Sequence, residues 1–313
     1  MHIIFAYIKF LLRSTNQHGV HSPFVFNLVT KCFYDKKEYP AYAILKQYRR
    51  ALRKDKRIIK IKDFGAGSRT FRSDERRVSE IAKNAGISTK RARLLNRLVR
   101  YLKVDRALEL GTSLGLGTSA MAAGNEVKIT TIEGCLETAA IAKEQFDRFN
   151  FSGIEPKVGK FEAFLEDSGQ RAEDINSKSQ IFTRRSPGEG GPNSNFSTTD
   201  NPQPTTYNRR TDGADLQSVP GKPNSILNTQ YSLLYIDGNH RKEATLRYFE
   251  KLLPTVHNDT VMIFDDIHWS AGMEEAWEEI KKHPSVTVTI DTFFWGLVFF
   301  RQEQEKEHFV IRV

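Results

Sequence analysis

The stretch ALELGTSLGLGTSAMA, residues 107–122, contains residue types that can serve more than one chemistry. GTSLG, centred on Ser113, matches the sharp turn that exposes a nucleophilic serine in hydrolases. GLGTSA, which starts at Gly115, matches the glycine-rich fingerprint that lets backbone approach a dinucleotide pyrophosphate. In a third interpretation, Glu109 precedes a loop whose two glycines, Gly111 and Gly115, let backbone approach the amino-acid portion of a ligand.

The position of each motif relative to the preceding strand separates these interpretations. RALELG predicts a buried strand ending at Gly111, whereas the dinucleotide fingerprint would start only at Gly115. A hydrolase would need an acid and a late histidine, for which Asp291 and His308 are candidates, but no HGGG-type oxyanion segment precedes the loop. The third interpretation uses more residues. Glu133 ends the next predicted strand, 22 residues after Gly111, and can accept both hydroxyls of a ribose.

Three carboxylates follow later predicted strands. Asp237 ends one strand, and Asp265 and Asp266 end the next. Because the carboxyl ends of neighbouring parallel strands meet at one edge of a sheet, we expect the three groups to lie together. Oxygen ligands suit Mg²⁺, which would hold two substrate oxygens and lower the pKa of a hydroxyl. The alternative is that the acidic pair stabilises the N-terminus of the following helix.

Strand and helix patterns alternate from Arg106 onward, which predicts βαβ units around a parallel sheet. We therefore expect an α/β, Rossmann-like sheet of seven strands, preceded by a mainly helical N-terminal region. The last two strands are close enough in sequence to pair as an antiparallel hairpin. The expected strands cover residues 106–111, 127–134, 156–159, 231–238, 260–266, 286–301 and 308–313.

The predicted organisation is a basic helical region at 1–104 and a ligand-binding domain at 105–313, interrupted by an insertion at 168–229. The insertion holds six of the eleven prolines and few apolar residues. Its composition cannot bury enough apolar surface to offset the entropy of ordering, so we expect it to be disordered. It lies in a helix-to-strand connection, away from the strand ends where ligands bind.

The charge is uneven along the chain. Residues 1–104 contain 25 Lys and Arg against 7 Asp and Glu, whereas the remainder contains 22 against 31. The segment 78–103 resembles a helix-turn-helix, with basic residues on its second helix: Lys90, Arg91, Arg93 and Arg97. One interpretation is that this segment reads a DNA sequence. The simpler interpretation, which we favour, is a helical hairpin that packs on the sheet. The basic region could also form a lid, a homodimer contact or a patch for an acidic or membrane-bound acceptor.

Neither the composition nor any motif indicates a secreted or membrane-spanning protein. The chain has two cysteines far apart in sequence, no recognisable secretory signal, and an apolar N-terminal run too short to span a bilayer. We expect a cytoplasmic protein.

The ordered set LELGTSLGLGTS, TIEG, LLYIDGNH and MIFDDIHW resembles class I S-adenosylmethionine-dependent methyltransferases, in particular catechol and macrolide-sugar O-methyltransferases. The resemblance covers about residues 104–313 without the insertion. It implies a seven-stranded sheet with a terminal hairpin and S-adenosylmethionine as cofactor. The implied donor contacts are Gly111, Ser113, Gly115 and Glu133, with the adenine near Phe161 and with Glu109 interacting with the ammonium end directly or through water.

The resemblance also assigns roles around the carboxylates. In the metal-dependent types the ligands align with Asp237, Asp265 and Asp266; the catechol type has Asn at the last position, whereas the sugar type matches. His240 stands where these families place a general base. We therefore predict Mg²⁺-assisted O-methylation of a small molecule. A DNA-binding protein and a non-catalytic methyltransferase-like binding protein are the alternatives.

Overall fold

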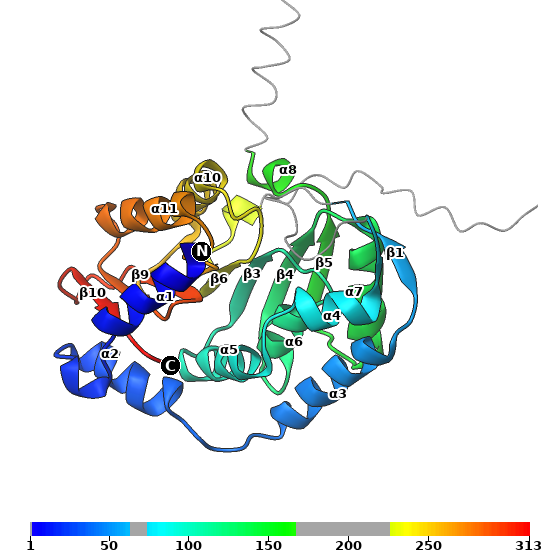
Figure 1. Cartoon of the computed structure of the whole chain (residues 1–313), viewed down its shortest axis with the longest axis horizontal. Helices are drawn as coiled ribbons and strands as arrows, with labels where there is room; N and C mark the ends of the chain where they lie inside the picture. The colour runs from blue at the N-terminus through cyan, green and yellow to red at the C-terminus, as the bar shows by residue number, and fades with distance from the viewer. Residues whose placement is uncertain (1, 63–73, 167–225) are drawn as a thin grey trace, which may run out of the picture. The chain divides into compact units, whose positions relative to one another are not determined.

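The computed structural model describes residues 2–62, 74–166 and 226–313, and all of these except Glu166 belong to one compact unit. Its centre is an eight-stranded sheet with the order β10-β8-β9-β7-β6-β3-β4-β5 (Figure 1). The strands are β3 (Arg106–Leu110), β4 (Lys128–Glu133), β5 (Ile154–Val158), β6 (Leu233–Ile236), β7 (Val261–Asp265), β8 (Val288–Asp291), β9 (Trp295–Phe299) and β10 (Glu307–Val310). The predicted fold class, a mostly parallel Rossmann-like sheet, is confirmed.

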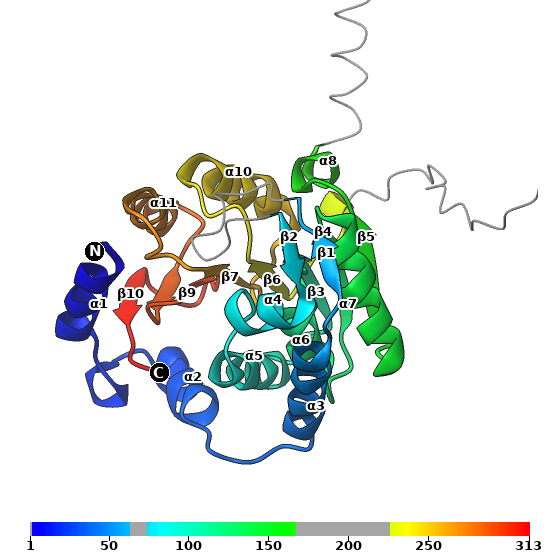
Figure 2. The ribbon, with the colours of Figure 1, turned by 45° about the vertical axis from the view of Figure 1, so that its right-hand side comes forward.

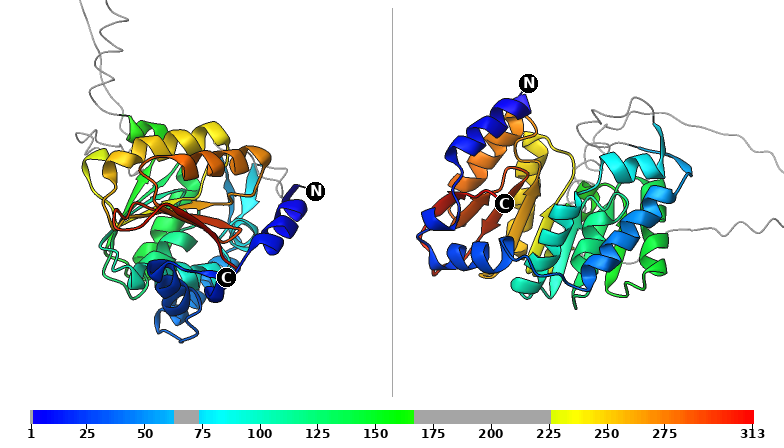
Figure 3. Two further views of the ribbon diagram at one scale, coloured as in Figure 1. Left: turned by 90° about the vertical axis from the view of Figure 1, so that its left-hand side faces the viewer. Right: turned by 60° about the horizontal axis from the view of Figure 1, so that its bottom comes forward.

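The central strands are buried on both faces because helices cover both sides of the sheet (Figure 3, left). Side chains alternate between the two cores, as the two-residue period of a strand requires. In β6, Leu233 and Tyr235 pack into one hydrophobic cluster, whereas Leu234 and Ile236 pack into the other. The helices are α6 (Leu116–Ala122) and α7 (Leu136–Arg148) in the first layer, and α8 (Phe161–Leu165), α10 (Lys242–Leu252) and α11 (Ala271–Lys282) in the second.

The antiparallel hairpin is formed by different strands from those predicted. The stretch 286–301, predicted as one strand, divides into β8 and β9, which pair with each other in antiparallel fashion. Thr292 closes the turn with hydrogen bonds to Trp295, and Phe293 adopts a φ of +75°. β10 joins the free edge of β8 in parallel, because β7 and β8 already occupy both edges of β9.

The N-terminal region is mainly helical, as predicted. Its elements are α1 (His2–Arg13), η1 (Gln17–Gly19), α2 (Pro23–Leu28), η2 (Val29–Phe33), α3 (Ala41–Lys54), the antiparallel strands β1 (Ile58–Lys60) and β2 (Glu75–Arg77), α4 (Val78–Asn84) and α5 (Thr89–Tyr101). Residues of α3, α4 and α5 belong to the same hydrophobic cluster as one face of the sheet. In the described ranges, no helix combines the length and apolar character needed to cross a membrane.

Most of the predicted insertion lies outside the described residues. Its last residues are described: η3 (Ile226–Asn228) is a short 3-10 helix, and Ile226 is buried. Residues 226–228, which lie within the predicted insertion, therefore form part of the described structure. A further 3-10 turn, η4 (Leu253–Thr255), follows the end of α10 and contains Pro254.

Candidate active site

The glycine-rich loop after β3 needs glycine at two positions. Gly111 has a φ of +107°, and a Cβ atom there would overlap the backbone carbonyl oxygen of Asp237. Gly115 has a φ of +74° and forms the N-cap of α6. Both values lie in the region that favours glycine. The loop therefore lies directly against the end of β6, at the carboxyl edge of the sheet.

Glu109 is fully buried beneath this loop. Its Oε2 accepts hydrogen bonds from the hydroxyls of Thr118 at 2.5 Å and Thr131 at 2.6 Å. Its Oε1 has no hydrogen-bond partner among the described residues and lies where a Cβ on Gly117 would approach it to 2.5 Å. Burial raises the pKa of Glu109 to about 7, although the two threonine hydroxyls act in the opposite direction. A buried acceptor without a partner fits a missing ligand or water, because such groups are rarely left unpaired.

Glu133 ends β4, and the glycine-rich loop after β3 holds its carboxylate in place. Its Oε2 accepts the backbone N–H of Ser113 at 2.7 Å, and its Oε1 accepts the backbone N–H of Cys135 at 2.9 Å. Ser113 reaches this position with a φ of +48°. An ionised carboxylate has about four acceptor sites, so these two backbone bonds do not by themselves prevent Glu133 from accepting a ligand hydroxyl.

A small cavity beside the loop is closed by the N-terminal region. It is lined by the loop residues Gly111 and Ser113, by Asp237, and by Ile81 and Gly86 around the turn between α4 and α5. Figure 2 shows α4 and α5 beside α6. The helical pair thus covers the predicted donor loop, a position that the sequence analysis did not assign to it.

The basic residues of the helix-turn-helix-like segment make contacts within the chain. Lys90 Nζ donates to the Val313 carbonyl oxygen at 2.6 Å, and Arg93 pairs with Glu38 at 2.8 Å. Arg97 donates to the carbonyl oxygens of η2. Six residues of α5 are buried, which supports the interpretation as a helical hairpin packed on the sheet: Ala92, Leu94, Leu95, Asn96, Leu98 and Val99.

The carboxylates predicted to bind a metal lie at the ends of β6 and β7. Asp237 and Asp265 are within hydrogen-bonding reach of each other, and their side chains are 24% and 7% exposed. Burial and the neighbouring carboxylates raise the pKa of each to about 7. Asp266 follows with a φ of +54°, and its backbone N–H donates to the Phe294 carbonyl oxygen at 2.7 Å.

A guanidinium group lies among these carboxylates. Arg91, in the first turn of α5, donates from Nη1 to Asp265 Oδ1 at 2.9 Å. The same guanidinium stacks on the ring of Phe294, with its Cζ 4.8 Å from the ring centroid. In the sequence, Arg91 is one of four basic residues on the second helix of the helix-turn-helix-like segment. No local motif reveals that Arg91 pairs with Asp265, because Asp265 lies 174 positions further along the chain.

The described part of the chain contains no group of three or more His, Cys, Asp and Glu side chains arranged to hold a metal ion. Asp237 and Asp265 are close together, but Asp265 already has a cationic partner in Arg91. As they stand, these side chains fit a guanidinium better than a divalent ion. The assignment of Asp237, Asp265 and Asp266 as metal ligands stays a prediction.

His240 and Phe161 both lie near the end of β6. His240 Nε2 is 3.8 Å from Asp237 Oδ1, and its ring centroid is 6.3 Å from that of Trp269. The ring of Phe161 would be 2.8 Å from a Cβ on Gly238, so it packs directly on the residue after Asp237. Both residues are therefore at the edge of the sheet where the glycine-rich loop lies.

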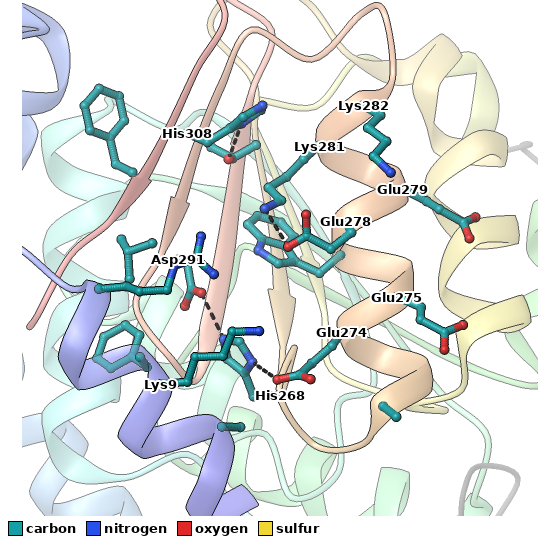
Figure 4. A pocket seen from close by; sticks show the side chains of 18 residues that line it. Lys9, His268, Glu274, Glu275, Glu278, Glu279, Lys281, Lys282, Asp291 and His308 are labelled. Carbon is teal, nitrogen blue, oxygen red and sulfur yellow. Dashed lines mark hydrogen bonds and ion pairs between the residues drawn. The ribbon is translucent and has the colours of Figure 1, made fainter. Parts of the chain in front are cut away.

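A larger cavity, of about 600 Å³, lies between α1, α11 and the strands β8 and β10 at one end of the sheet (Figure 4). His268 projects into it and bridges two carboxylates, Glu274 at 2.7 Å and Asp291 at 2.9 Å. Burial opposes the charged form of His268, but the two carboxylates outweigh it and raise its pKa. The lining of this larger cavity includes none of the residues of the glycine-rich loop, so the cavity does not coincide with the predicted donor contacts.

The hydrolase interpretation is not supported by the sheet order. His308 lies on β10 and Ser113 follows β3, which are five strand positions apart. At about 4.8 Å per strand, this separates them by roughly 24 Å. His308 contacts Thr289, and Asp291 contacts His268. A serine, a histidine and an acid are not brought together here.

The sheet order, the glycine-rich loop and the acidic residues at the strand ends define a Rossmann-like protein whose predicted site residues lie at the carboxyl edge of the sheet. Residues 108–267 match the family described as "Methyltransferase domain". The match spans just over half of the 313 residues, so the chain belongs to this methyltransferase family. The resemblance to methyltransferases predicted from the sequence is confirmed. No curated protein sequence matches the chain.

Several solved structures have a similar fold. One is an O-methyltransferase from Bacillus cereus in complex with S-adenosylhomocysteine, with 16% identity, 85% of this chain and 93% of that chain covered, and a TM-score of 0.43. Another is the O-methyltransferase of tomaymycin synthesis from Streptomyces achromogenes in complex with S-adenosylmethionine. It has 14% identity, the match covers 85% of this chain and 91% of that chain, and the TM-score is 0.45. A third is the S-adenosylhomocysteine-bound methyltransferase from Podospora anserina, with 11% identity, coverage of 90% and 97%, and a TM-score of 0.48.

Proposed function

We propose that the chain transfers a methyl group from S-adenosylmethionine to an oxygen atom of a small-molecule acceptor. Membership of the methyltransferase family supports methyl transfer. The observation that supports the donor most directly is the junction of the loops after β3 and β4. There the Glu133 carboxylate is fixed by the backbone N–H groups of Ser113 and Cys135, beside a loop with positive φ at Gly111 and Gly115.

Each of these residues has a role in holding the donor. The loop glycines let backbone approach the amino-acid portion, and Glu133 accepts the ribose hydroxyls. The unpaired Oε1 of Glu109 accepts from the ammonium group, directly or through a water molecule. Phe161, packed on Gly238, lines the adenine side. When bound, S-adenosylmethionine supplies an electrophilic methyl group.

The acceptor side is formed by the end of β6 and the segment after it. His240 is the proposed general base, since an imidazole nitrogen can take a proton from a hydroxyl. Its Nε2 is turned toward Asp237, so Nδ1 would take the acceptor proton while the Asp237 carboxylate stabilises the positive imidazolium. The enzyme contributes mainly position and a site shielded from water.

The sequence also predicts that Mg²⁺ assists the methyl transfer. It would require Asp237, Asp265 and Asp266 to act together, but Arg91 is bound to Asp265 in this arrangement. We therefore assign no step of the reaction to a metal ion. Calorimetry with MgCl₂ and then with EDTA tests this part separately from donor binding.

The donor site is tested by calorimetric titration of S-adenosylhomocysteine into the full-length protein and into Glu133→Ala. We expect binding to weaken at least tenfold in the variant, because the hydrogen bonds to the ribose hydroxyls are lost. Glu126→Ala is the matched control, since Glu126 is exposed and precedes the opposite end of β4. It should bind like the unchanged protein.

Absence of binding to the unchanged protein would contradict the proposal. Binding without methyl transfer to any phenol, catechol or sugar hydroxyl in a radiolabelled-methyl assay would favour the non-catalytic binding protein instead. Equal weakening in Glu133→Ala and Glu126→Ala would mean that Glu133 does not contact the donor.

A further inference from the structure

The acidic side chains at the ends of β6 and β7, which include Asp237 and Asp265, lie beside the cationic side chain of Arg91. We propose that the guanidinium of Arg91 occupies the position between Asp237 and Asp265 that a divalent ion would otherwise take, so that the protein binds no metal there while Arg91 is present. The carrying observation is the contact of Arg91 Nη1 with Asp265 Oδ1 at 2.9 Å.

The pair is enclosed, so neither charge is satisfied by bulk water alone. The Asp265 side chain is 7% exposed and that of Arg91 is 23% exposed. A buried carboxylate that loses its partner is strongly destabilised, whereas an exposed ion pair can open at little cost. Arg91 therefore behaves as a structural counter-ion of Asp265. A divalent ion at the same carboxylate would have to displace it.

The guanidinium is also held in place from its other side. Its Cζ lies 4.8 Å from the ring centroid of Phe294, in the turn between β8 and β9, which is cation–π geometry. The backbone of Arg91 is anchored too, because its N–H donates to Oγ of Ser88, the N-cap of α5, at 3.2 Å. These contacts come from two different parts of the chain and fix the group between them.

The remaining acidic groups are placed around this guanidinium. Asp237 Oδ2 accepts from the hydroxyl of Tyr235 at 3.3 Å, and its Oδ1 is 3.8 Å from His240 Nε2. Asp237 and Asp266 both act electrostatically on Arg91. A divalent ion placed among them would meet the fixed positive charge of Arg91 at close range, and this repulsion opposes its binding.

The experiment measures binding of Mn²⁺, used as a spectroscopic probe for Mg²⁺, by electron paramagnetic resonance. The samples are the unchanged protein, Arg91→Ala, Asp265→Asn, and the double variant Arg91→Ala/Asp265→Asn. We expect Arg91→Ala to bind one Mn²⁺ at these carboxylates, the unchanged protein and Asp265→Asn to bind none there, and the double variant to lose the site that Arg91→Ala gains. Arg93→Ala is the matched control, because Arg93 lies on the same helix but pairs with the exposed Glu38.

One Mn²⁺ bound to the unchanged protein and lost in Asp265→Asn would overturn the proposal. So would an Arg91→Ala variant that folds, as judged by circular dichroism, but gains no site. If Arg91→Ala does not fold, the comparison of the unchanged protein with Asp265→Asn still decides, because the proposal requires that neither binds Mn²⁺ at these carboxylates. None of these measurements needs methyl transfer, so a failure of the proposed function would be seen separately.

Discussion

Gly111 lies so close to the end of β6 that any Cβ atom at this position would overlap the carbonyl oxygen of Asp237. This contact joins the loop after β3 to the strand that carries the acidic edge. The backbone N–H of Asp237 also donates to the carbonyl oxygen of Leu110 at 2.8 Å, within the parallel pairing of β3 and β6. The proposed donor loop and the proposed acceptor edge are thus held together by backbone alone.

Replacing Gly111 by alanine should therefore destabilise the protein and weaken donor binding. The strained backbone alone costs on the order of 1–3 kcal/mol, and the overlap with Asp237 adds to it. Thermal unfolding should show a decrease in Tm of several degrees. Gly272→Ala in α11 is the control, because Gly272 has only ordinary contacts from 3.5 Å outward. A Tm of Gly111→Ala equal to that of the control would contradict this reading of the loop.

The buried carboxyl group of Glu109 predicts a pH dependence of stability. Burial raises its pKa from 4.5 to about 7, so the folded state binds the extra proton in this interval. The contribution of Glu109 to the free energy of unfolding therefore falls as pH rises through the interval, by about 3 kcal/mol in all. Glu109→Gln removes this titration. Urea unfolding should show the variant gaining stability relative to the unchanged protein between pH 5 and pH 8, whereas a constant difference would show that Glu109 does not titrate there.

His240 is predicted to affect turnover and not donor binding. If it removes the acceptor proton, His240→Ala should lower kcat about one hundredfold or more, with little change in the affinity for S-adenosylhomocysteine. His18→Ala is a suitable control, because His18 is exposed in η1. Equal turnover in both variants would remove His240 from the mechanism. Weaker donor binding in His240→Ala would indicate a role in shaping the site.

Asn96 links the helix-turn-helix-like segment to the fold. Its side-chain amide donates to the carbonyl oxygens of Ala120 at 2.9 Å and Ala123 at 2.7 Å, at the end of α6. Asn96→Ala leaves two buried acceptors without these bonds and should lower the free energy of unfolding by about 2 kcal/mol. Asn27→Ala, which removes an exposed bond within α2, should have a much smaller effect in the same urea titration. Similar effects would mean that α5 is not packed as described.

Local sequence was sufficient for much of the fold. A strand buried on both faces shows a continuous apolar run, and a Gly or Asp at its end marks the edge where ligands bind. These two patterns were enough to locate β3, β4, β6 and β7 with their terminal residues. The hairpin could not be assigned correctly. The stretch 286–301 has β-type residues throughout, and the turn at Phe293 depends on a positive φ at a residue type that does not signal one.

The sequence by itself therefore determined the class of fold, the glycine-rich loop and the set of residues at the carboxyl edge, because each follows from a local pattern of backbone freedom and burial. Only the tertiary structure decided what surrounds them. Arg91 could be seen as one of four basic residues on a helix, but its meeting with Asp265 depends on how α5 packs across the sheet. Contacts between residues so far apart in sequence are set by the packing of whole elements, and no short motif records them.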